Sequence, residues 1–259
     1  MSIIKPTPSS APVFYPKNDY TIVKYIDLTK FISLLHRESL FFCRLDKLED
    51  QFEGTTAKAN FDVRIRWYQQ TNHLLHQSLT HEEILKHVEE LYEHERKLKA
   101  LNCVNCWNKK NIESAALWKI YSDFSKGIMI KSSISRIEKA LEETKEDIKL
   151  SEIRYIDYNN ETMLDGNTMY PLIHKQTAYS YEDEVRLIYE VMPEFGWEYD
   201  WTKEEVQEGF YLKTDLNELI DEVVIGPYSP EWFLKLVQDI ANKYGLNKLI
   251  TKSQLSLNK

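Results

Sequence analysis

The chain has 259 residues, a formal net charge of −8, 42% hydrophobic residues and 29% charged residues. This length supports one large core or two small ones, and the composition is that of an ordinary globular protein. The negative charge disfavours broad binding to nucleic acid or anionic membranes, which needs a cationic surface, although a local basic patch would still admit nucleic acid. No run of about 18 apolar residues is present, so we expect no membrane span and no membrane partner.

The N-terminal residues 1–19 are predicted to form a flexible leader. They are rich in proline and lack the charged-then-apolar order of a signal peptide. The chain has three cysteines, Cys43, Cys103 and Cys106, too few for a disulfide framework. The odd count fits a reducing compartment, so we expect a cytoplasmic protein.

The first half of the chain is predicted to mix short strands with helices. A strand over residues 20–26 precedes a helix that Asp27 caps, and a second strand covers residues 40–44. Residues 46–54 form a charged turn. From about 57 to 100 the pattern is helical and polar, and Thr80 with Glu83 makes a capping box. We interpret this stretch as a helical insertion in a single domain of residues 20–259.

The second half continues the same mixture. Strands are predicted over residues 102–107, 126–131, 148–158, 182–191, 210–213, 222–226 and 249–252, with helices over 114–121 and 133–142. Ser229 is expected to cap a last helix with Pro230 at its first position, ended by Gly245. The aromatic segment 193–209 is expected to be a loop. Without strict strand–helix alternation, this predicts an α+β fold with a central mixed, mainly antiparallel sheet flanked by helices.

The sharpest candidate site lies in the predicted strand 182–191. Glu182, Glu184 and Arg186 alternate along it, so their side chains share one face. Two carboxylates about 7 Å apart beside a guanidinium suit acid–base chemistry or ribose binding. The alternative is an edge strand whose charged outer face makes ordinary salt bridges.

Three further polar candidates lie beside turns and strand ends, where binding sites are usually built. They are Asp50 and Glu53 in the charged turn and Lys175 just upstream of the acidic strand. Lys175 has the charge needed to neutralise a phosphate.

Aromatic residues form another candidate group. Trp118 and Tyr121 lie one helical turn apart, close to Trp107 on the preceding strand. Core packing explains such a group, and stacking of a nicotinamide or adenine ring is the alternative. No Gly-rich phosphate loop follows a strand, which disfavours the usual nucleotide-binding folds.

Metal chemistry has little support. Cys103 and Cys106 supply half of a zinc ligand set, and no second pair with suitable spacing exists. The histidines of the helical insertion, such as His87 and His94, lie among Glu and Lys residues typical of a solvated helix face. We therefore predict no metal.

Seven short motifs follow one another in a fixed order over residues 20–226. They are Lys24-Tyr25, Asp50-Gln51-Phe52-Glu53-Gly54, Asn102-Cys103 to Trp107, Leu117-Trp118-Lys119-Ile120-Tyr121, Lys126-Gly127-Ile128, Lys175 with Tyr181-Glu182-Asp183-Glu184-Val185-Arg186-Leu187-Ile188, and Glu222-Val223-Val224-Ile225-Gly226. In this order they resemble a bacterial family of uncharacterised proteins, domain-of-unknown-function family 2971. The chain departs from the family at Gln51, where proline is usual, and at Trp107, where phenylalanine is usual.

The layout is also similar, more distantly, to the ADP-ribosyltransferase superfamily, in which a late strand carries Glu-x-Glu. The resemblance implies NAD as the substrate, with Glu184 steadying the charge that grows on the ribose and Glu182 orienting the acceptor. Lys24 or Tyr25 stands where the first strand of the superfamily carries Arg or His. The superfamily's Ser-Thr-Ser triplet has no clear counterpart here.

Two functions follow as hypotheses. The first is an NAD-consuming transferase or glycohydrolase with an unknown acceptor, in which Trp118 or Tyr121 stacks the base and Lys175 or Arg186 holds pyrophosphate. The second is a non-catalytic sensor or interaction module, in a defence or stress system, whose charged strand is an internal ion-pair ladder. Its helical insertion is the expected partner surface. A metal-dependent nuclease is a weaker third option, and the oligomeric state is left open.

Overall fold

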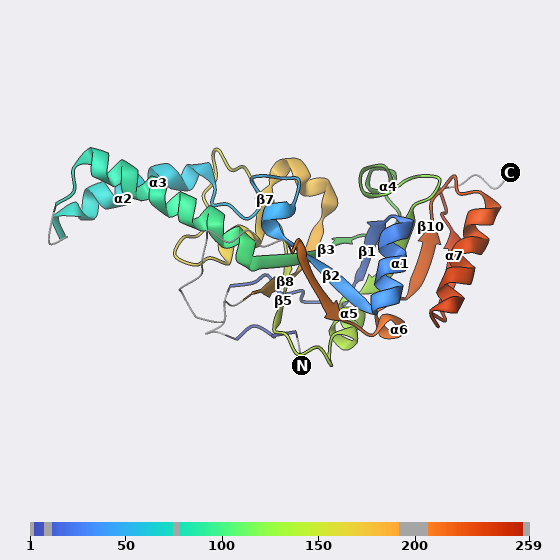
Figure 1. Ribbon diagram of the computed structural model, residues 1–259. Helices are drawn as coiled ribbons and strands as arrows, with labels where there is room; N and C mark the ends of the chain where they lie inside the picture. The colour runs from blue at the N-terminus through green and yellow to red at the C-terminus, as the bar shows by residue number, and fades with distance from the viewer. Residues whose placement is uncertain (1–2, 8–11, 75–77, 192–206, 256–259) are drawn as a thin grey trace.

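The computed structural model describes residues 3–7, 12–74, 78–191 and 207–255 (Figure 1). Its centre is a nine-stranded sheet. Seven strands follow one another in the order β11-β10-β4-β1-β3-β2-β9, and the other two join at β3: β8 pairs with β3, and β5 pairs with β8. The strands are β1 Thr21–Ile26, β2 Ser39–Arg44, β3 Asn102–Lys109, β4 Ile128–Ser133, β5 Ile148–Glu152, β8 Glu184–Glu190, β9 Gly209–Lys213, β10 Glu222–Ile225 and β11 Leu249–Lys252. In the described part of the chain, β10 and β11 pair in parallel, and the other strand pairs of this sheet are antiparallel. The predicted α+β class with a mainly antiparallel sheet is confirmed.

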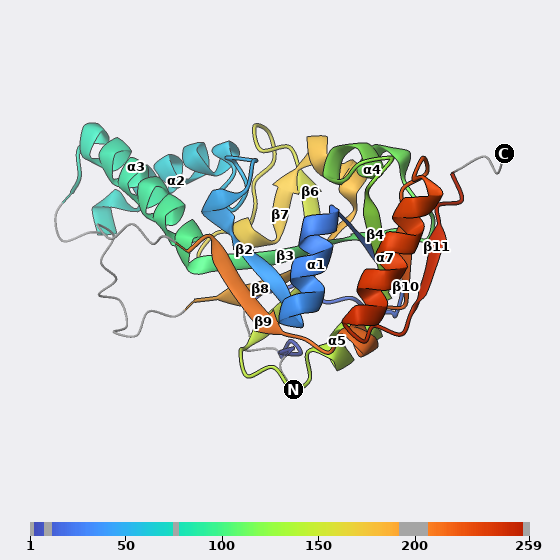
Figure 2. The ribbon, with the colours of Figure 1, turned by 45° about the vertical axis from the view of Figure 1, so that its right-hand side comes forward.

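One face of the sheet is covered by four helices, α1 Leu28–Arg37, α5 Ile134–Ala140, α6 Leu216–Leu219 and α7 Glu231–Lys243 (Figure 2). Helix α1 begins where the sequence predicts, because the Asp27 side chain accepts a hydrogen bond from the Lys30 backbone at 2.8 Å. Its buried residues Phe31, Leu34 and Leu35 pack into the largest apolar cluster of the molecule. Their helical spacing explains why this face turns toward the sheet.

The other face is covered in two places. Helix α4, Ala115–Tyr121, packs Leu117 and Trp118 against Val23 and Tyr25 of β1. Residues 153–173 pack a second apolar cluster against Val104 and Ile188. Charged side chains of β8 and its surroundings are also buried on the sheet.

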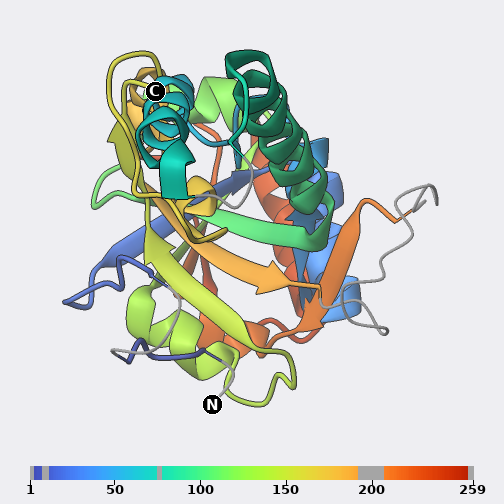
Figure 3. The same cartoon turned by 90° about the vertical axis from the view of Figure 1, so that its left-hand side faces the viewer.

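Two further helices, α2 Lys58–Thr71 and α3 His81–Leu98, form an antiparallel pair that extends from one end of the sheet (Figures 1 and 3). They occupy the range predicted to be a helical insertion. The capping box at Thr80 and Glu83 is present and starts α3. A short helix, Lys99–Leu101, connects α3 directly to β3, so α3 is anchored to the centre of the sheet.

Three local predictions differ from the structure. The strand predicted over 148–158 is divided, because β6 (Arg154–Ile156) leaves the main sheet and pairs with β7 (His174–Gln176). Glu182 ends a 3-10 helix, Thr177–Glu182, and β8 begins only at Glu184 after Asp183 adopts a left-handed conformation. Pro230, not Ser229, is the residue before α7, and no side chain caps that helix.

The described part of the expected leader lies against the sheet. Ile3 is buried and bridges to Ile148, and the Phe14 carbonyl accepts a hydrogen bond from the Glu152 backbone. Most of the predicted aromatic loop 193–209, with Trp197, Tyr199 and Trp201, falls outside the described residues. Within the described parts of the chain, no helix combines the length and the apolar character that crossing a membrane demands.

Candidate functional site

Five of the predicted site residues meet in one buried ionic network: Glu53, Lys175, Glu182, Glu184 and Arg186. They come from the charged turn, β7, the 3-10 helix and β8. Their exposed fractions lie between 0% and 6%. These five of the sequence-based candidates therefore lie together in the fold.

Lys175 is the centre of the network. Its ammonium group lies 2.7 Å from Glu182 Oε2, 3.1 Å from Glu184 Oε2 and 3.6 Å from Glu53 Oε1. The second oxygen of Glu182 accepts a hydrogen bond from the Tyr121 hydroxyl at 2.5 Å. Both carboxylates of the Glu-x-Glu pair are thus bonded through each of their oxygens.

Arg186 uses all three of its nitrogens. Nε donates to Glu184 Oε1 at 2.7 Å, Nη1 donates to the Leu172 carbonyl at 2.9 Å, and Nη2 donates to Glu53. A guanidinium this well satisfied fixes the positions of the groups around it. The network therefore joins the charged turn, β8 and residue 172 into one rigid unit.

The pKa values of Glu182 and Glu184 are shifted in opposite directions. Burial raises the pKa of Glu182, and Lys175 offsets this only in part. Burial also acts to raise the pKa of Glu184, but the charges of Arg186 and Lys175 outweigh it and hold that pKa well below its ordinary value. The carboxylate charges raise the pKa of Lys175 despite its burial, so it stays protonated.

The interpretation of this strand as a charged edge is wrong. Strand β8 lies between β3 and β5, and Glu184 and Arg186 are 3% and 0% exposed. Asp50, also predicted near the site, makes no bond to the network that the structure records. Its side chain instead accepts a hydrogen bond from the Phe52 backbone at 2.9 Å within the turn.

The remaining candidates do not gather around Glu184 in one aromatic cleft. Trp107 belongs to the large core cluster and donates to Asn105 at 2.8 Å. Trp118 packs edge-on against Tyr25 in a different cluster, with ring centroids 5.0 Å apart. Of the aromatic residues predicted to form one face, only Tyr121 reaches the network, through its hydrogen bond to Glu182.

Strands β1 and β2 pair with the same edge of β3 and leave a gap between them, and the Lys24 side chain lies in this gap. Strand β1 pairs with the end of β3 at residues 108 and 109, and β2 pairs with its start at residues 103 and 104. Between these pairings the Lys24 ammonium donates to the Cys106 carbonyl at 2.7 Å and lies 5.7 Å from the Trp107 ring centroid. Burial lowers the pKa of Lys24.

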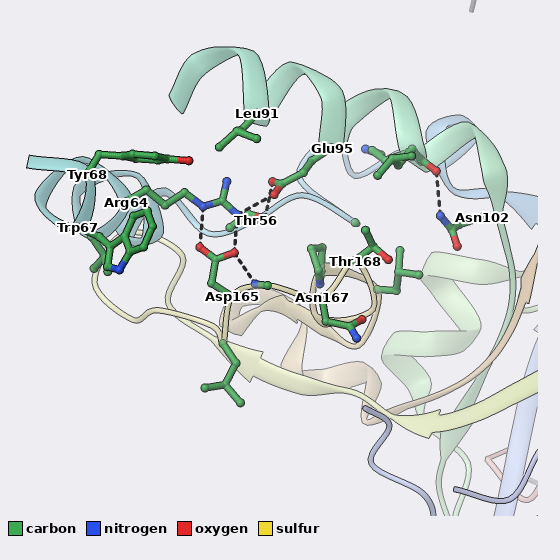
Figure 4. A pocket seen from close by; sticks show the side chains of 18 residues that line it. Thr56, Arg64, Trp67, Tyr68, Leu91, Glu95, Asn102, Asp165, Asn167 and Thr168 are labelled. Carbon is green, nitrogen blue, oxygen red and sulfur yellow. Dashed lines mark hydrogen bonds and ion pairs between the residues drawn. The ribbon is translucent and has the colours of Figure 1, made fainter. Parts of the chain in front are cut away.

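A cavity of about 610 Å³ lies between the α2–α3 pair and residues 164–172 (Figure 4). Most of the surface that lines it is apolar, and the side chains of Val63, Trp67, Leu91, Leu98 and Leu172 contribute to it. Binding pockets for small molecules have this character: a mainly apolar wall with a few placed polar groups.

The strongest polar feature of the cavity is Arg64 of α2. Its Nε and Nη2 donate to the two oxygens of Asp165, each at 2.7 Å, and Nη2 also donates to Glu95 at 2.6 Å. Glu95 is held in turn by the Thr56 hydroxyl at 2.6 Å. The third nitrogen, Nη1, is buried without a protein hydrogen-bond partner, and it lies on the side of Leu91 in Figure 4.

The second polar feature is Asn102, at the other end of the cavity in Figure 4. Its amide nitrogen donates to the Leu98 carbonyl at 2.8 Å, while its Oδ1 is buried without a protein partner. Buried polar atoms are nearly always bonded, and leaving one unbonded costs about 1–3 kcal/mol. In the described residues four buried side-chain atoms lack a partner, and two of them belong to residues that line this one cavity.

Sequence analysis did not identify Arg64, Glu95, Asp165 or Asn102. The ion pairs of Arg64 span 31 and 101 residues, so no short motif contains them. One signal was available in α2, whose buried residues are the polar pair Asn60 and Arg64, one turn apart. A helix that buries polar residues must satisfy them elsewhere in the fold.

The cavity and the ionic network share a wall. Leu172 lines the cavity, and its carbonyl accepts from Arg186. Gly54 lines it as well and directly follows Glu53, which pairs with the same guanidinium. Arg186 therefore fixes two segments of the cavity wall from behind.

No group of three His, Cys, Asp or Glu side chains in the described residues is arranged to hold a metal ion. Comparison of the chain with protein-family models, curated proteins and solved structures finds no match. The candidate site therefore has to be judged from its own geometry.

Proposed function

We propose that this protein is a ligand-binding module whose site is the cavity between the α2–α3 pair and residues 164–172. This is the non-catalytic sensor hypothesis, with the helical insertion supplying half of the binding site. The observation that carries it is the cavity of about 610 Å³, whose lining surface is mainly apolar and includes a few polar side chains held in place by hydrogen bonds, such as Arg64 and Asn102. A ligand that enters the cavity gains the free energy of covering this apolar surface.

The ionic network supports this proposal because it holds part of the cavity wall in place. Glu182, Glu184 and Arg186 are buried and fully bonded, and Arg186 fixes Leu172 and, through Glu53, the neighbouring Gly54 at the cavity wall. A rigid wall keeps a site preorganised, which lowers the entropic cost of binding. In this proposal the charged strand is a scaffold for the site.

The test is a fluorescence titration with Nile red, an uncharged dye with a carbonyl acceptor. We expect saturable binding to the wild type and at least tenfold weaker binding to Leu91→Trp, because the larger ring fills the cavity. Leu236→Trp, on α7 and also partly exposed, is the matched control and should bind like the wild type. Equal binding by all three proteins would reject the cavity as the site.

NAD chemistry is the second proposal, and one observation favours it. Glu182 and Glu184 converge at Lys175, and their pKa values are shifted in opposite directions, as in pairs where one carboxyl is the acid and the other stays ionised. In this proposal Glu184 steadies the positive charge on the ribose and an acceptor of unknown identity attacks. It requires that the contacts of Lys175 with both carboxylates, and of Tyr121 with Glu182, break when the substrate binds.

This second proposal is tested by nicotinamide release from NAD. It expects turnover by the wild type, loss of turnover in Glu184→Gln, and retained turnover in the control Glu190→Gln, a partly exposed position on the same strand. Absence of turnover by the wild type, together with cavity binding of Nile red, would favour the ligand-binding module. Membership of domain-of-unknown-function family 2971 stays a prediction.

A further inference from the structure

We infer that His174 is a pH-sensitive latch: its neutral imidazole holds residues 12–14, the N-terminal segment, against the sheet, and its protonation releases them. The latch goes beyond the proposed function, because it lies in a different part of the molecule and works whether or not the cavity binds a ligand. The contacts of Phe14, the bonding of the imidazole and the neighbouring charges all point to this role.

Phe14 joins the N-terminal segment to the edge of β5. Its backbone N–H donates to the Ser151 hydroxyl at 2.9 Å, and its carbonyl accepts from the Glu152 backbone at 2.8 Å. Its side chain packs, together with that of Val13, against the apolar cluster around Ile188. A contact of two hydrogen bonds and two side chains opens at a small free-energy cost, so a change beside the Phe14 ring is enough to shift it.

The Phe14 ring contacts both His174 and Arg154. The imidazole of His174 meets it edge to face, with ring centroids 5.7 Å apart and planes at 84°. The Arg154 guanidinium carbon lies 3.6 Å from the centroid of the Phe14 ring, which is a cation–π contact. Arg154 and His174 are also paired with each other in the register of β6 and β7. Phe14 is therefore held by one permanent cation and by one group that becomes a cation on acidification.

The hydrogen bond of His174 determines where a second proton must go. Nδ1 lies 2.7 Å from the Tyr170 carbonyl oxygen, and a carbonyl only accepts, so Nδ1 carries the proton of the neutral ring. A second proton is therefore added at Nε2 and makes the ring an imidazolium. The His174 residue is 6% exposed, so water contributes little to the stability of that charge.

The surroundings of His174 disfavour the charged ring while Phe14 is bound. Burial lowers the pKa of His174 below its ordinary value of 6.5, the bond to Tyr170 opposes this effect, and the charge of Arg154 adds to it. The Tyr158 hydroxyl, which donates to the His174 carbonyl at 3.2 Å, brings no charge. The carboxylates of the ionic network bond to the next residue, Lys175, whose side chain takes the opposite face of β7.

The sign of the pH effect follows from this lowered pKa. The bound form of the segment is fully stable above pH 6.5 and loses stability as the pH falls through the lowered pKa of His174. Acidification therefore favours the form in which Phe14 has left the imidazole and the ring is free to take up its proton.

Release of Phe14 uncovers two surfaces. The apolar cluster beneath it loses the cover of Val13 and Phe14, and β5 loses its backbone bond at Glu152. The change stays local, because the next residue, Tyr15, is tied down separately by its hydrogen bond to Glu138. An unpaired strand edge beside apolar surface is a site where another chain can bind.

The experiment is amide hydrogen exchange of the full chain at about pH 7.5 and pH 5.0, expressed as protection factors, which remove the direct effect of pH on exchange. At the lower pH ordinary histidines are charged, while the lowered pKa of Glu184 keeps that group ionised. We expect the protection of the Phe14 and Glu152 amides to fall roughly ten- to thirtyfold, because ordinary imidazoles are about thirty to one protonated at pH 5.0. The Ile130 amide, on β4 between β1 and β10, is the internal reference and should keep its protection.

Two variants assign the effect to one histidine. His174→Asn keeps an N–H donor for the Tyr170 carbonyl and does not titrate in this range, so it should abolish the fall in protection. His36→Asn is the matched control, because His36 also packs edge-on against an aromatic ring, that of Tyr244 at 6.0 Å, and its loss should leave the fall unchanged. Titration of the His174 ring by NMR in the wild type gives a second measurement that needs no variant.

The outcomes decide for or against the latch. A fall confined to Phe14 and Glu152, which His174→Asn alone removes, supports it. No fall in the wild type, an equal fall in His174→Asn, or a fall of the same size at Ile130 would overturn it. An imidazole of His174 that titrates at or above pH 6.5 would overturn it as well, even if the variant does not fold.

Discussion

Two buried arginines distinguish the ionic network from the proposed binding cavity. Arg186 and Arg64 are each held by two carboxylates, and both are more than nine-tenths buried. The difference is in the last nitrogen, which donates to the Leu172 carbonyl in Arg186 and has no protein partner in Arg64. The comparison teaches that charge and burial alone do not identify a binding site, because a fully bonded cluster has nothing left to offer a ligand.

The largest expected effect comes from deleting the guanidinium in each region. Arg186→Met should lower the free energy of unfolding by about 4 kcal/mol, because Glu184 and Glu53 are left as buried, poorly compensated charges. Arg64→Met should lower it by only about 1–2 kcal/mol, since Asp165 is half-exposed to water. It should also weaken Nile red binding at least fivefold. Urea denaturation and dye titration measure both effects, and equal destabilisation by the two variants would contradict the distinction.

The pH dependence of stability sharpens the same comparison. The pKa of Glu184 lies below its ordinary value of 4.5 in the folded protein, so its contribution is present above pH 4.5 and is lost as the pH falls. Glu182 acts in the opposite sense, because its raised pKa adds stability at low pH that is lost as the pH rises through the folded pKa. Acidification from neutral pH to about pH 3 lowers the free energy of unfolding. Glu184→Gln should therefore reduce this acid-induced loss, called here the acid limb of the stability curve, by roughly 2 kcal/mol.

Asp165→Asn is the matched control for this measurement. Arg64 also lowers the pKa of Asp165, but water screens this half-exposed group, so its removal should flatten the acid limb less. Urea denaturation in a series of buffers gives both curves. An acid limb that is the same in the wild type and in Glu184→Gln would show that the network does not hold Glu184 ionised.

The smallest expected effect comes from the edge of the network. Tyr121→Phe removes the hydroxyl that donates to Glu182 and should cost about 1 kcal/mol, because Tyr121 is 40% exposed and water can replace part of the bond. Thermal melting measures this loss. A loss as large as that of Arg186→Met would contradict this ranking of the two contacts.

Much of the scaffold could be predicted from the sequence. The spacing of Glu184 and Arg186 predicts a shared face on a strand, and both side chains do meet in the network. Glu53 and Lys175 were identified because they lie beside turns, and they complete the same network. Burial was not predictable, because a charged strand has the same pattern at an edge as at the centre of a sheet with buried counter-ions.

The cavity could not be predicted in the same way. Arg64, Glu95 and Asp165 meet only after the chain has folded across a gap of 101 residues, and each of them alone has the pattern of a solvated helix or loop. Arg64 and Asn102 line the cavity from two elements that are far apart in the sequence, so no short motif contains both. Such a site can be recognised only in the folded structure.

The most direct test of this distinction is one crystal structure of the protein soaked with Nile red and NAD together. We predict density for the dye in the cavity, in contact with Leu91 and Leu172. The Glu182–Lys175–Glu184 contacts should be unchanged. Density for NAD with a ribose against Glu184, and none in the cavity, would contradict the account.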